Sequence, residues 1–196
     1  MPGKNDFFQD LDDRLGRRNT PRTRLQLIGS VALMGVTGQS WGTEDADILE
    51  ALDLSAEIKA SLLELGGPGS DLAKRHGLYL EFVPNGLPLL PQKPAFAPLI
   101  DLEDLKSLEV QALDVTDVIV SKLARFNARD VRDIRRMADI ARIDHERLLL
   151  RFKPAIDLMQ FDARADRIPK YLSNLHTVER DILLLPETPI DLPDSA

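Results

Sequence analysis

Apolar residues recur at two different spacings along this chain, and the spacing predicts where helices and strands form. Short continuous or alternating apolar runs predict strands at residues 25–28, 43–49, 78–83 and 108–113. Apolar positions three or four residues apart predict helices over residues 6–16, 31–36, 55–65, 70–76, 115–126, 129–141, 145–159 and 167–183. The predicted strands all precede residue 114 and the longest run of helices follows it, so the pattern predicts an α+β fold.

Residues at the ends of these segments agree with the boundaries. Ser55 is a typical N-cap for the helix over 55–65, and the run GGPG at 66–69 ends that helix. Prolines recur through residues 84–98, and proline lacks the backbone N–H that a helix or a central strand needs. We therefore expect residues 84–98 to form an ordered loop over one end of the sheet.

The change of pattern near residue 114 predicts two regions and a tail. Residues 1–113 would form a core around a small mixed sheet of about four strands, and residues 114–185 a helical region packed on it. The sequence PETPIDLPDSA at 186–196 is expected to be a disordered or loosely packed tail. Within the helical region, apolar spacing predicts one buried stripe, formed by Val131, Ile134, Ala138 and Ala141.

Composition limits the possible chemistry. The 196-residue chain has a net charge of −7, three histidines and no cysteine, so it forms neither disulfides nor thiolate zinc sites. No apolar run reaches the roughly 20 residues that cross a bilayer, and the first residues lack the apolar core of a signal peptide. We therefore expect a cytoplasmic protein without a membrane partner. The acidic charge argues against non-specific duplex binding by the whole surface.

Positive charge is concentrated in the helical half of the chain. Residues 122–153 hold ten Lys/Arg against five Asp/Glu. Two interpretations stay open. The charges belong either to solvated helix faces, with i,i+4 pairs such as Arg129 with Asp133, or to a surface that steers a polyanion such as a nucleoside triphosphate or RNA.

Two aspartates near residue 46 are the strongest candidates for chemistry. In a strand, Asp45 and Asp47 share one face about 7 Å apart, while Ala46 points away. Two carboxylates so placed suit a divalent cation such as Mg²⁺, which prefers hard oxygen ligands. Earlier in the chain, Gly29 permits a sharp turn, and Ser30 would lie at a helix N-terminus, where N–H groups attract phosphate. A phosphate site and a metal site together are typical of nucleotide binding.

A third carboxylate lies in the predicted strand LYLEFV at 78–83. Glu81 is the one charged residue of this apolar segment, and a charge there costs free energy unless it has a partner. Two interpretations are equally open. Glu81 either shares a metal ion with Asp45 and Asp47, or faces water from an edge strand.

These residues carry a resemblance to a known superfamily. The spaced motifs are Gly29-Ser30-x-Ala32-Leu33, Thr43-x-Asp45-x-Asp47, and Asp117-x-x-x-x-Lys122-Leu123 followed by Arg129-Asp130. Over residues 24–153 the chain resembles the DNA polymerase β superfamily of nucleotidyltransferases. More narrowly, it resembles the bacterial nucleotidyltransferase-like proteins related to the AbiE-type abortive-infection toxins. Two positions depart from the family pattern: Trp41-Gly42 replaces the usual Arg before the Thr, and Ile28 replaces the first Gly of a Gly-Gly-Ser.

The resemblance implies a Mg²⁺-dependent enzyme that moves a nucleoside monophosphate from a nucleoside triphosphate to a hydroxyl group. It implies metal binding by Asp45, Asp47 and Glu81, and catalytic roles for these residues and Lys122. It further implies nucleotide binding by four residues: Gly29, Ser30, Lys122 and Arg129. From the residues alone, Lys122 is also consistent with a side chain that extends along the surface to water.

The acceptor and the partners are open at this stage. In the toxin relatives the acceptor is RNA or protein, in other relatives it is a small molecule, and an antitoxin-like partner is implied for the toxin type. Trp41 is expected to pack in its loop, although its place beside the aspartates also permits base stacking. The alternative function is a catalytically degenerate nucleotidyltransferase fold that serves as a nucleotide- or protein-binding module, which the missing Arg favours.

Overall fold

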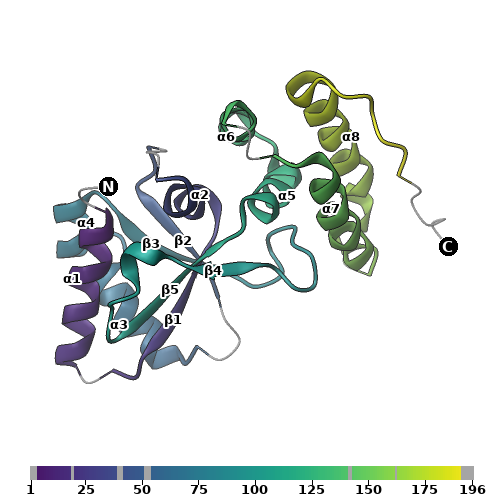
Figure 1. Cartoon of the computed structure of the whole chain (residues 1–196). Coiled ribbons are helices and arrows are strands. Elements are labelled where there is room, and N and C mark those ends of the chain that lie inside the picture. Colours follow the sequence, from purple (N-terminus) through teal and green to yellow (C-terminus); the bar gives the residue numbers. More distant parts are fainter. Residues whose placement is uncertain are drawn as a thin grey trace. The chain divides into compact units, whose positions relative to one another are not determined.

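The computed structural model describes residues 4–18, 20–38, 42–50, 54–140, 143–161 and 163–190. It confirms the α+β fold, with a mixed sheet in the first part of the chain and helices in the second (Figure 1). The strands are β1 Thr23–Leu27, β2 Asp45–Leu49, β3 Tyr79–Val83, β4 Phe96–Pro98 and β5 Leu108–Leu113. The α-helices are α1 Lys4–Arg17, α2 Gly29–Thr37, α3 Ala56–Gly66, α4 Asp71–His76, α5 Val115–Arg125, α6 Ala128–Asp139, α7 His145–Met159 and α8 Ile168–Val178.

The chain divides into two compact units, and the boundary falls inside α5. The first unit comprises Met1–Leu87 with Ala95–Val118, and the second comprises Pro88–Pro94 with Ile119–Ala196. The first unit contains the whole sheet. The second contains the helices from the later turns of α5 onward.

The sheet has the strand order β3-β2-β1-β5-β4. β1 pairs antiparallel with β2 and parallel with β5, while β2 pairs parallel with β3. The fifth strand, β4, was not predicted from the sequence, because it lies in the proline-rich segment. It pairs antiparallel with β5 at the edge of the sheet, where a proline without an N–H is tolerated. Asp117 fixes the start of β4 by accepting a hydrogen bond from the N–H of Ala95 at 2.8 Å.

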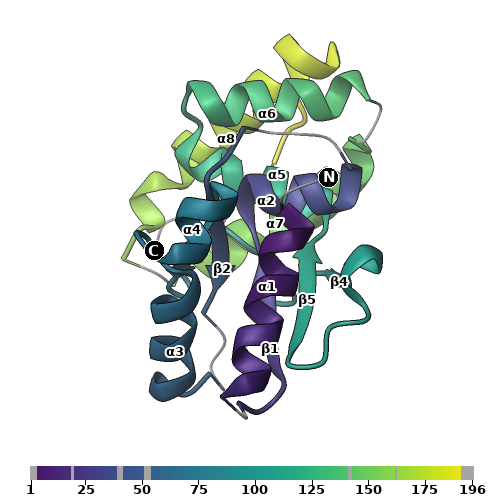
Figure 2. The same ribbon diagram turned by 90° about the vertical axis from the view of Figure 1, so that its left-hand side faces the viewer.

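The two faces of the sheet carry different side chains because strand residues alternate in direction. Ala46 and Ile48 of β2 and Leu80 of β3 are fully or almost fully buried. A Cβ on Gly66 of α3 would lie 3.3 Å from Leu80 and 3.1 Å from Phe7 of α1, so α1 and α3 cover this apolar face. The aspartates of β2 and Glu81 of β3 therefore lie on the opposite face. Figure 2 shows α1, α3 and α4 as a group of helices beside the strands.

Several helices begin and end as the sequence predicts. Ser55 caps α3, and its side-chain oxygen accepts a hydrogen bond from the N–H of Ile58. Ser70 caps α4 in the same way through Ala73. Asp12 links α1 to the sheet. Its buried carboxylate accepts hydrogen bonds from three successive backbone N–H groups at the start of β5, those of Lys106, Ser107 and Leu108.

In the second unit, the buried stripe predicted for α6 is confirmed at Ile134 and wrong at its other two described positions, Val131 and Ala138. The buried residues of α6 are Asp130, Asp133, Ile134 and Met137, while Val131 and Ala138 are half-buried. Ala141 lies outside the described residues. The reason is that two buried aspartates face a buried lysine on α5, so that this side of the helix is apolar only in part.

The end of the described chain is held against the second unit. The tail predicted to be loosely packed includes residues 186–190, where Ile190 is buried and the N–H of Thr188 donates to the carboxylate of Glu179 at 3.1 Å. His145 contacts the other oxygen of Glu179 at 2.8 Å. Burial pushes the pKa of Glu179 upward, but these two hydrogen bonds outweigh it and hold the pKa below its usual value. Residues 191–196 lie outside the described part.

Candidate functional site

The parallel pairing of β2 with β3 brings three carboxylates together. The register places Asp47 opposite Glu81 and Asp45 opposite Tyr79, all on one face of the sheet. One carboxylate oxygen from each of Asp45, Asp47 and Glu81 lies within 4.8 Å of the other two. Asp45 and Asp47 are half-buried and Glu81 is exposed. The sequence left open whether Glu81 faces water at an edge or approaches the aspartates, and the structure shows both.

Gly29 lies directly against this carboxylate cluster, which is formed by Asp45, Asp47 and Glu81. Its φ of +63° belongs to the left-handed region that favours glycine. A Cβ at this position would lie 2.6 Å from Oδ2 of Asp47, so a side chain would collide with the carboxylate. The backbone is tied at the same point, because the N–H of Ile28 donates to the carbonyl oxygen of Asp47 at 2.9 Å.

Helix α2 begins at Gly29, so its N-terminus lies next to Asp47. The N-cap is Ile28, which provides no side-chain hydrogen bond to the first turn. Ser30 is therefore the second residue of the helix and not its N-cap, and its side chain is buried. The N–H groups of a first helical turn have no partner within the helix and carry partial positive charge, which favours a bound anion.

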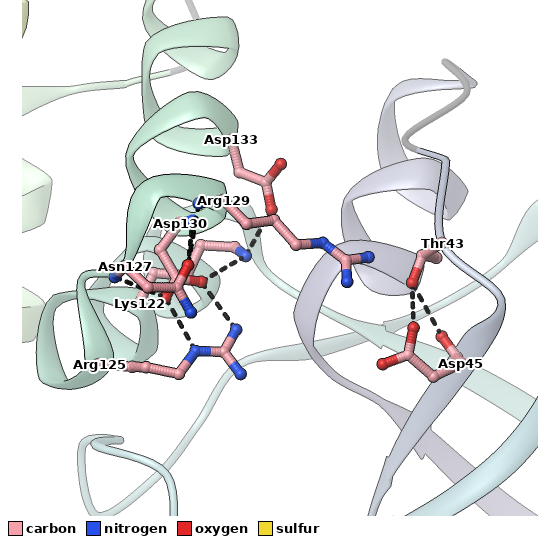
Figure 3. A network of polar contacts seen from close by, with 8 residues as sticks. All are labelled: Thr43, Asp45, Lys122, Arg125, Asn127, Arg129, Asp130 and Asp133. Atoms are coloured by element: carbon pink, nitrogen blue, oxygen red, sulfur yellow. Dashed lines mark hydrogen bonds and ion pairs between the residues drawn. The ribbon is translucent and has the colours of Figure 1, made fainter.

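Thr43 orients Asp45, a role that the sequence did not assign to it. Its buried hydroxyl donates a hydrogen bond to Oδ1 of Asp45, as Figure 3 shows. The hydroxyl fixes one oxygen of the carboxylate and so restricts how the other can turn. The signal in the sequence was a Thr two residues before the Asp, but this spacing occurs in many loops and identifies the contact only when the strand is known.

The electrostatics of the carboxylate cluster are strongly negative. The pKa of the Tyr79 phenol is raised, first by burial and then by the negative charges of Asp45, Glu81, Glu44 and Asp47. Three carboxylates held this close repel one another, and a divalent cation bound between them would relieve the repulsion. Their hard oxygen donors match the preference of Mg²⁺ and similar cations. The residues present therefore fit a divalent metal ion.

Lys122 and its neighbours form a separate polar network in the second unit (Figure 3). The Lys122 side chain is 3% exposed, and its Nζ lies 2.6 Å from Oδ2 of Asp133 and 3.2 Å from Oδ1 of Asp130. Arg125 binds Asp130 through two hydrogen bonds of 2.8 Å. Asn127 and Asp130 form a reciprocal cap at the start of α6. The network joins α5 to α6.

Asp130 is charged despite its complete burial. Burial pushes its pKa upward, but the hydrogen bond from Arg125 and the positive charges of Lys122 and Arg125 outweigh this effect and hold the pKa below its usual value. The ammonium of Lys122, which the resemblance implies would face nucleotide phosphates, is thus bound by two carboxylates. The roles of Lys122 and Arg129 in nucleotide binding stay predictions. Trp41 lies outside the described residues.

Comparison with known proteins gives one clear assignment. No helix in the described part of the chain is long and apolar enough to cross a membrane. The searches of curated proteins and of solved structures gave no match. Residues 6–181 match the family of nucleotidyltransferases of unknown function, DUF6036, and this range includes the whole sheet and the carboxylate cluster. Because the match covers most of its length, the chain belongs to this nucleotidyltransferase family.

Proposed function

We propose that the protein is a Mg²⁺-dependent nucleotidyltransferase that moves a nucleoside monophosphate from a nucleoside triphosphate to a hydroxyl acceptor. The observation that carries this proposal is the carboxylate cluster of Asp45, Asp47 and Glu81, within 4.8 Å of one another, on one face of β2 and β3. Gly29 at the start of α2 lies against one member of the cluster. A cation site beside a helix N-terminus suits a ligand that is a metal-bound polyphosphate.

The three carboxylates would hold the Mg²⁺, with Thr43 keeping Asp45 in its orientation. When bound, the metal supplies positive charge to the phosphates. The first turn of α2, with Ser30, would bind the terminal phosphates, and the absence of a side chain on Gly29 leaves room for them. These contacts position the triphosphate for attack.

The transfer forms one P–O bond and breaks another. The oxygen of the acceptor hydroxyl attacks the α-phosphorus, and the bond from that phosphorus to the oxygen that bridges to the β-phosphate breaks. Pyrophosphate leaves, and the hydroxyl proton passes to a base. Glu81 is the exposed member of the cluster, and we assign it this role of base.

The resemblance alone limits the acceptor to three classes of molecule. RNA, protein and small molecules are all acceptors among the relatives, and a toxin-type activity would add an antitoxin-like protein partner. Lys122 and Arg129 are retained as nucleotide-binding residues in this proposal, and Arg129→Ala tests it without breaking the buried ion pairs of Lys122.

A second function is favoured by a specific observation. Asp130 and Asp133 neutralise Lys122, which is the state expected if this lysine has a structural role. A degenerate nucleotidyltransferase fold that binds a nucleotide or a protein without catalysis is consistent with that arrangement and with the loss of the Arg before Thr43.

Thermal unfolding with each nucleoside triphosphate, with and without Mg²⁺, tests the proposal. A ligand that binds only the folded state stabilises it by about 2.7 kcal/mol at a hundredfold excess over its dissociation constant. We expect a Mg²⁺-dependent shift in the wild type that is lost in Asp45→Asn and Asp47→Asn. It should persist in Asp13→Asn, which changes an exposed aspartate of α1.

Transfer of radiolabel from the α-phosphate to cellular RNA, protein or small molecules then separates the two functions. Transfer that requires Asp45 and Asp47 supports the enzyme and names the acceptor class. Binding without transfer supports the degenerate fold. The absence of any Mg²⁺-dependent shift with all four triphosphates would refute nucleotide binding at this site.

A further inference from the structure

A pocket of about 390 Å³ lies in the first unit, along the later turns of α2. Its walls are apolar side chains from α1, β1, α2 and the segment after β4, among them Phe8, Leu27, Val31, Met34 and Leu99. A volume of this size is within the range of sites that hold small organic molecules. Its lining does not include the carboxylate cluster or the Gly29-Ser30 start of α2.

Gly35 sets the shape of this pocket. A Cβ on Gly35 would lie 2.7 Å and 2.9 Å from the two methyl carbons of Leu99, so only glycine lets that side chain approach the helix so closely. The contact holds the segment after β4 beside α2. The pocket is therefore formed by packing within the folded unit and does not need a ligand to open it.

The rim of the pocket leaves large apolar side chains in water. Ile100 is 81% exposed and Val36 is 42% exposed, and both line the pocket. An apolar ligand that covers exposed aliphatic side chains around a concave apolar surface removes them from water, which favours binding.

The polar end of the pocket is acidic. Asp101 is the one charged side chain among its described lining residues, and it accepts a hydrogen bond from the amide of Asn5 at 3.3 Å. Asp6, Glu103 and Asp104 are neighbours of these two residues in the chain. The first unit as a whole has ten Lys/Arg against nineteen Asp/Glu in its residue ranges, a net charge of −9. At the rim around Asp101 this charge favours cations over anions.

We propose that this pocket binds a small organic cation, with an apolar body against Phe8, Val31 and Met34 and an ammonium group at Asp101. The apolar walls favour the body, and the carboxylate at the rim selects the charge. A fatty acid or another amphiphilic anion would meet the same walls but would be repelled by the rim. The proposal does not depend on nucleotidyl transfer, because it uses none of the residues assigned to that reaction.

Methionine methyl groups give a direct test on the whole chain. The sequence has four methionines, and among the described ones Met34 lines the pocket while Met137 and Met159 belong to the second unit. With ¹³C-labelled methionine methyls, 2-phenylethylammonium should shift the Met34 signal and leave the other two unchanged. The matched neutral probe, 2-phenylethanol, should bind about three- to tenfold more weakly, and phenylacetate more weakly still.

Two variants of one residue type complete the experiment. Asp101→Asn should reduce the affinity for the ammonium probe to that for the alcohol, whereas Asp13→Asn, which changes an exposed aspartate of α1 outside the pocket lining, should leave it unchanged. No movement of the Met34 signal at millimolar ammonium would overturn the proposal. So would equal affinity for the ammonium and the carboxylate, or equal effects of the two variants.

Discussion

Replacement of Gly29 by alanine tests whether the carboxylate cluster needs a residue without a side chain at this position. The substitution adds a single methyl group and changes no charge. In the structure it has two consequences: a left-handed φ of +63° at a residue with a Cβ, and a Cβ that lies 2.6 Å from Oδ2 of Asp47. Since Cβ contacts shorter than 3.0 Å essentially never occur, the Asp47 carboxylate must move by at least about 0.4 Å.

The two consequences have separate magnitudes. The left-handed conformation costs about 1 kcal/mol for alanine, which in a protein of this size lowers Tm by roughly 2–4 °C. The displacement of Asp47 changes the geometry of the proposed metal site and therefore affects the reaction rate. A misplacement on the order of 1 Å can cost about a hundredfold in rate, so the proposed transferase activity should fall between tenfold and about a hundredfold.

Gly77→Ala is the matched control. Gly77 follows α4 with a φ of +62°, and a Cβ there would have no atom within 4 Å. Both variants therefore carry the backbone cost, and only Gly29→Ala collides with Asp47. We would measure Tm and the Mg²⁺-dependent stabilisation by nucleotide for each. We expect both variants to lose a similar amount of Tm, and nucleotide binding to be impaired only in Gly29→Ala. If Gly29→Ala binds nucleotide as strongly as Gly77→Ala, the reasoning is refuted.

Three further predictions concern stability. Lys122→Met leaves Asp130 and Asp133 buried without their ammonium and should cost about 3–5 kcal/mol in urea unfolding, part of which is recovered when both aspartates become Asn. Asp12→Ala removes the acceptor of three backbone N–H groups and should cost about 3 kcal/mol by the same assay, more than Asp12→Asn, whose amide oxygen still accepts. The lowered pKa values of Asp130 and Glu179 stabilise the fold at pH values above their unfolded pKa values of about 4, and this stabilisation is lost as the pH falls through their folded pKa values. An acid titration should therefore show the second unit unfolding below about pH 4. A stability that stays constant down to about pH 2 would contradict this.

The elements that the sequence predicted well are those that local information determines. Ser55 and Ser70 cap their helices, and the turn sequences after each helix end it within a residue or two of the predicted place. Apolar spacing alone predicted four of the five strands. β4 could not be predicted, because it lies in the proline-rich segment, its last residue is Pro98, and its three residues are identified as a strand by their pairing with β5.

The features that the sequence could not predict depend on contacts between distant segments. The parallel register of β2 with β3 places Glu81 beside Asp47, and a shift of one residue would have placed Glu81 on the other face. Likewise, Thr43 acquires its role only through the geometry of the strand that follows. Apolar periodicity misplaced the buried side of α6, because it counts Asp130 and Asp133 as solvent-facing residues.

The two groups of aspartates show why burial decides between structural and functional interpretations of the same residue type. Asp130 and Asp133 are buried with Lys122, which satisfies their charge within the fold and leaves them little capacity for a ligand. In the carboxylate cluster, Asp45 and Asp47 are half-buried and Glu81 is exposed, so the same kind of charge is presented where a cation from solution can reach it. A negative cluster that folding gathers on an accessible face costs electrostatic free energy, and the binding of a divalent cation is the event that recovers it. The stability of the first unit should therefore rise with Mg²⁺ even before a nucleotide is added.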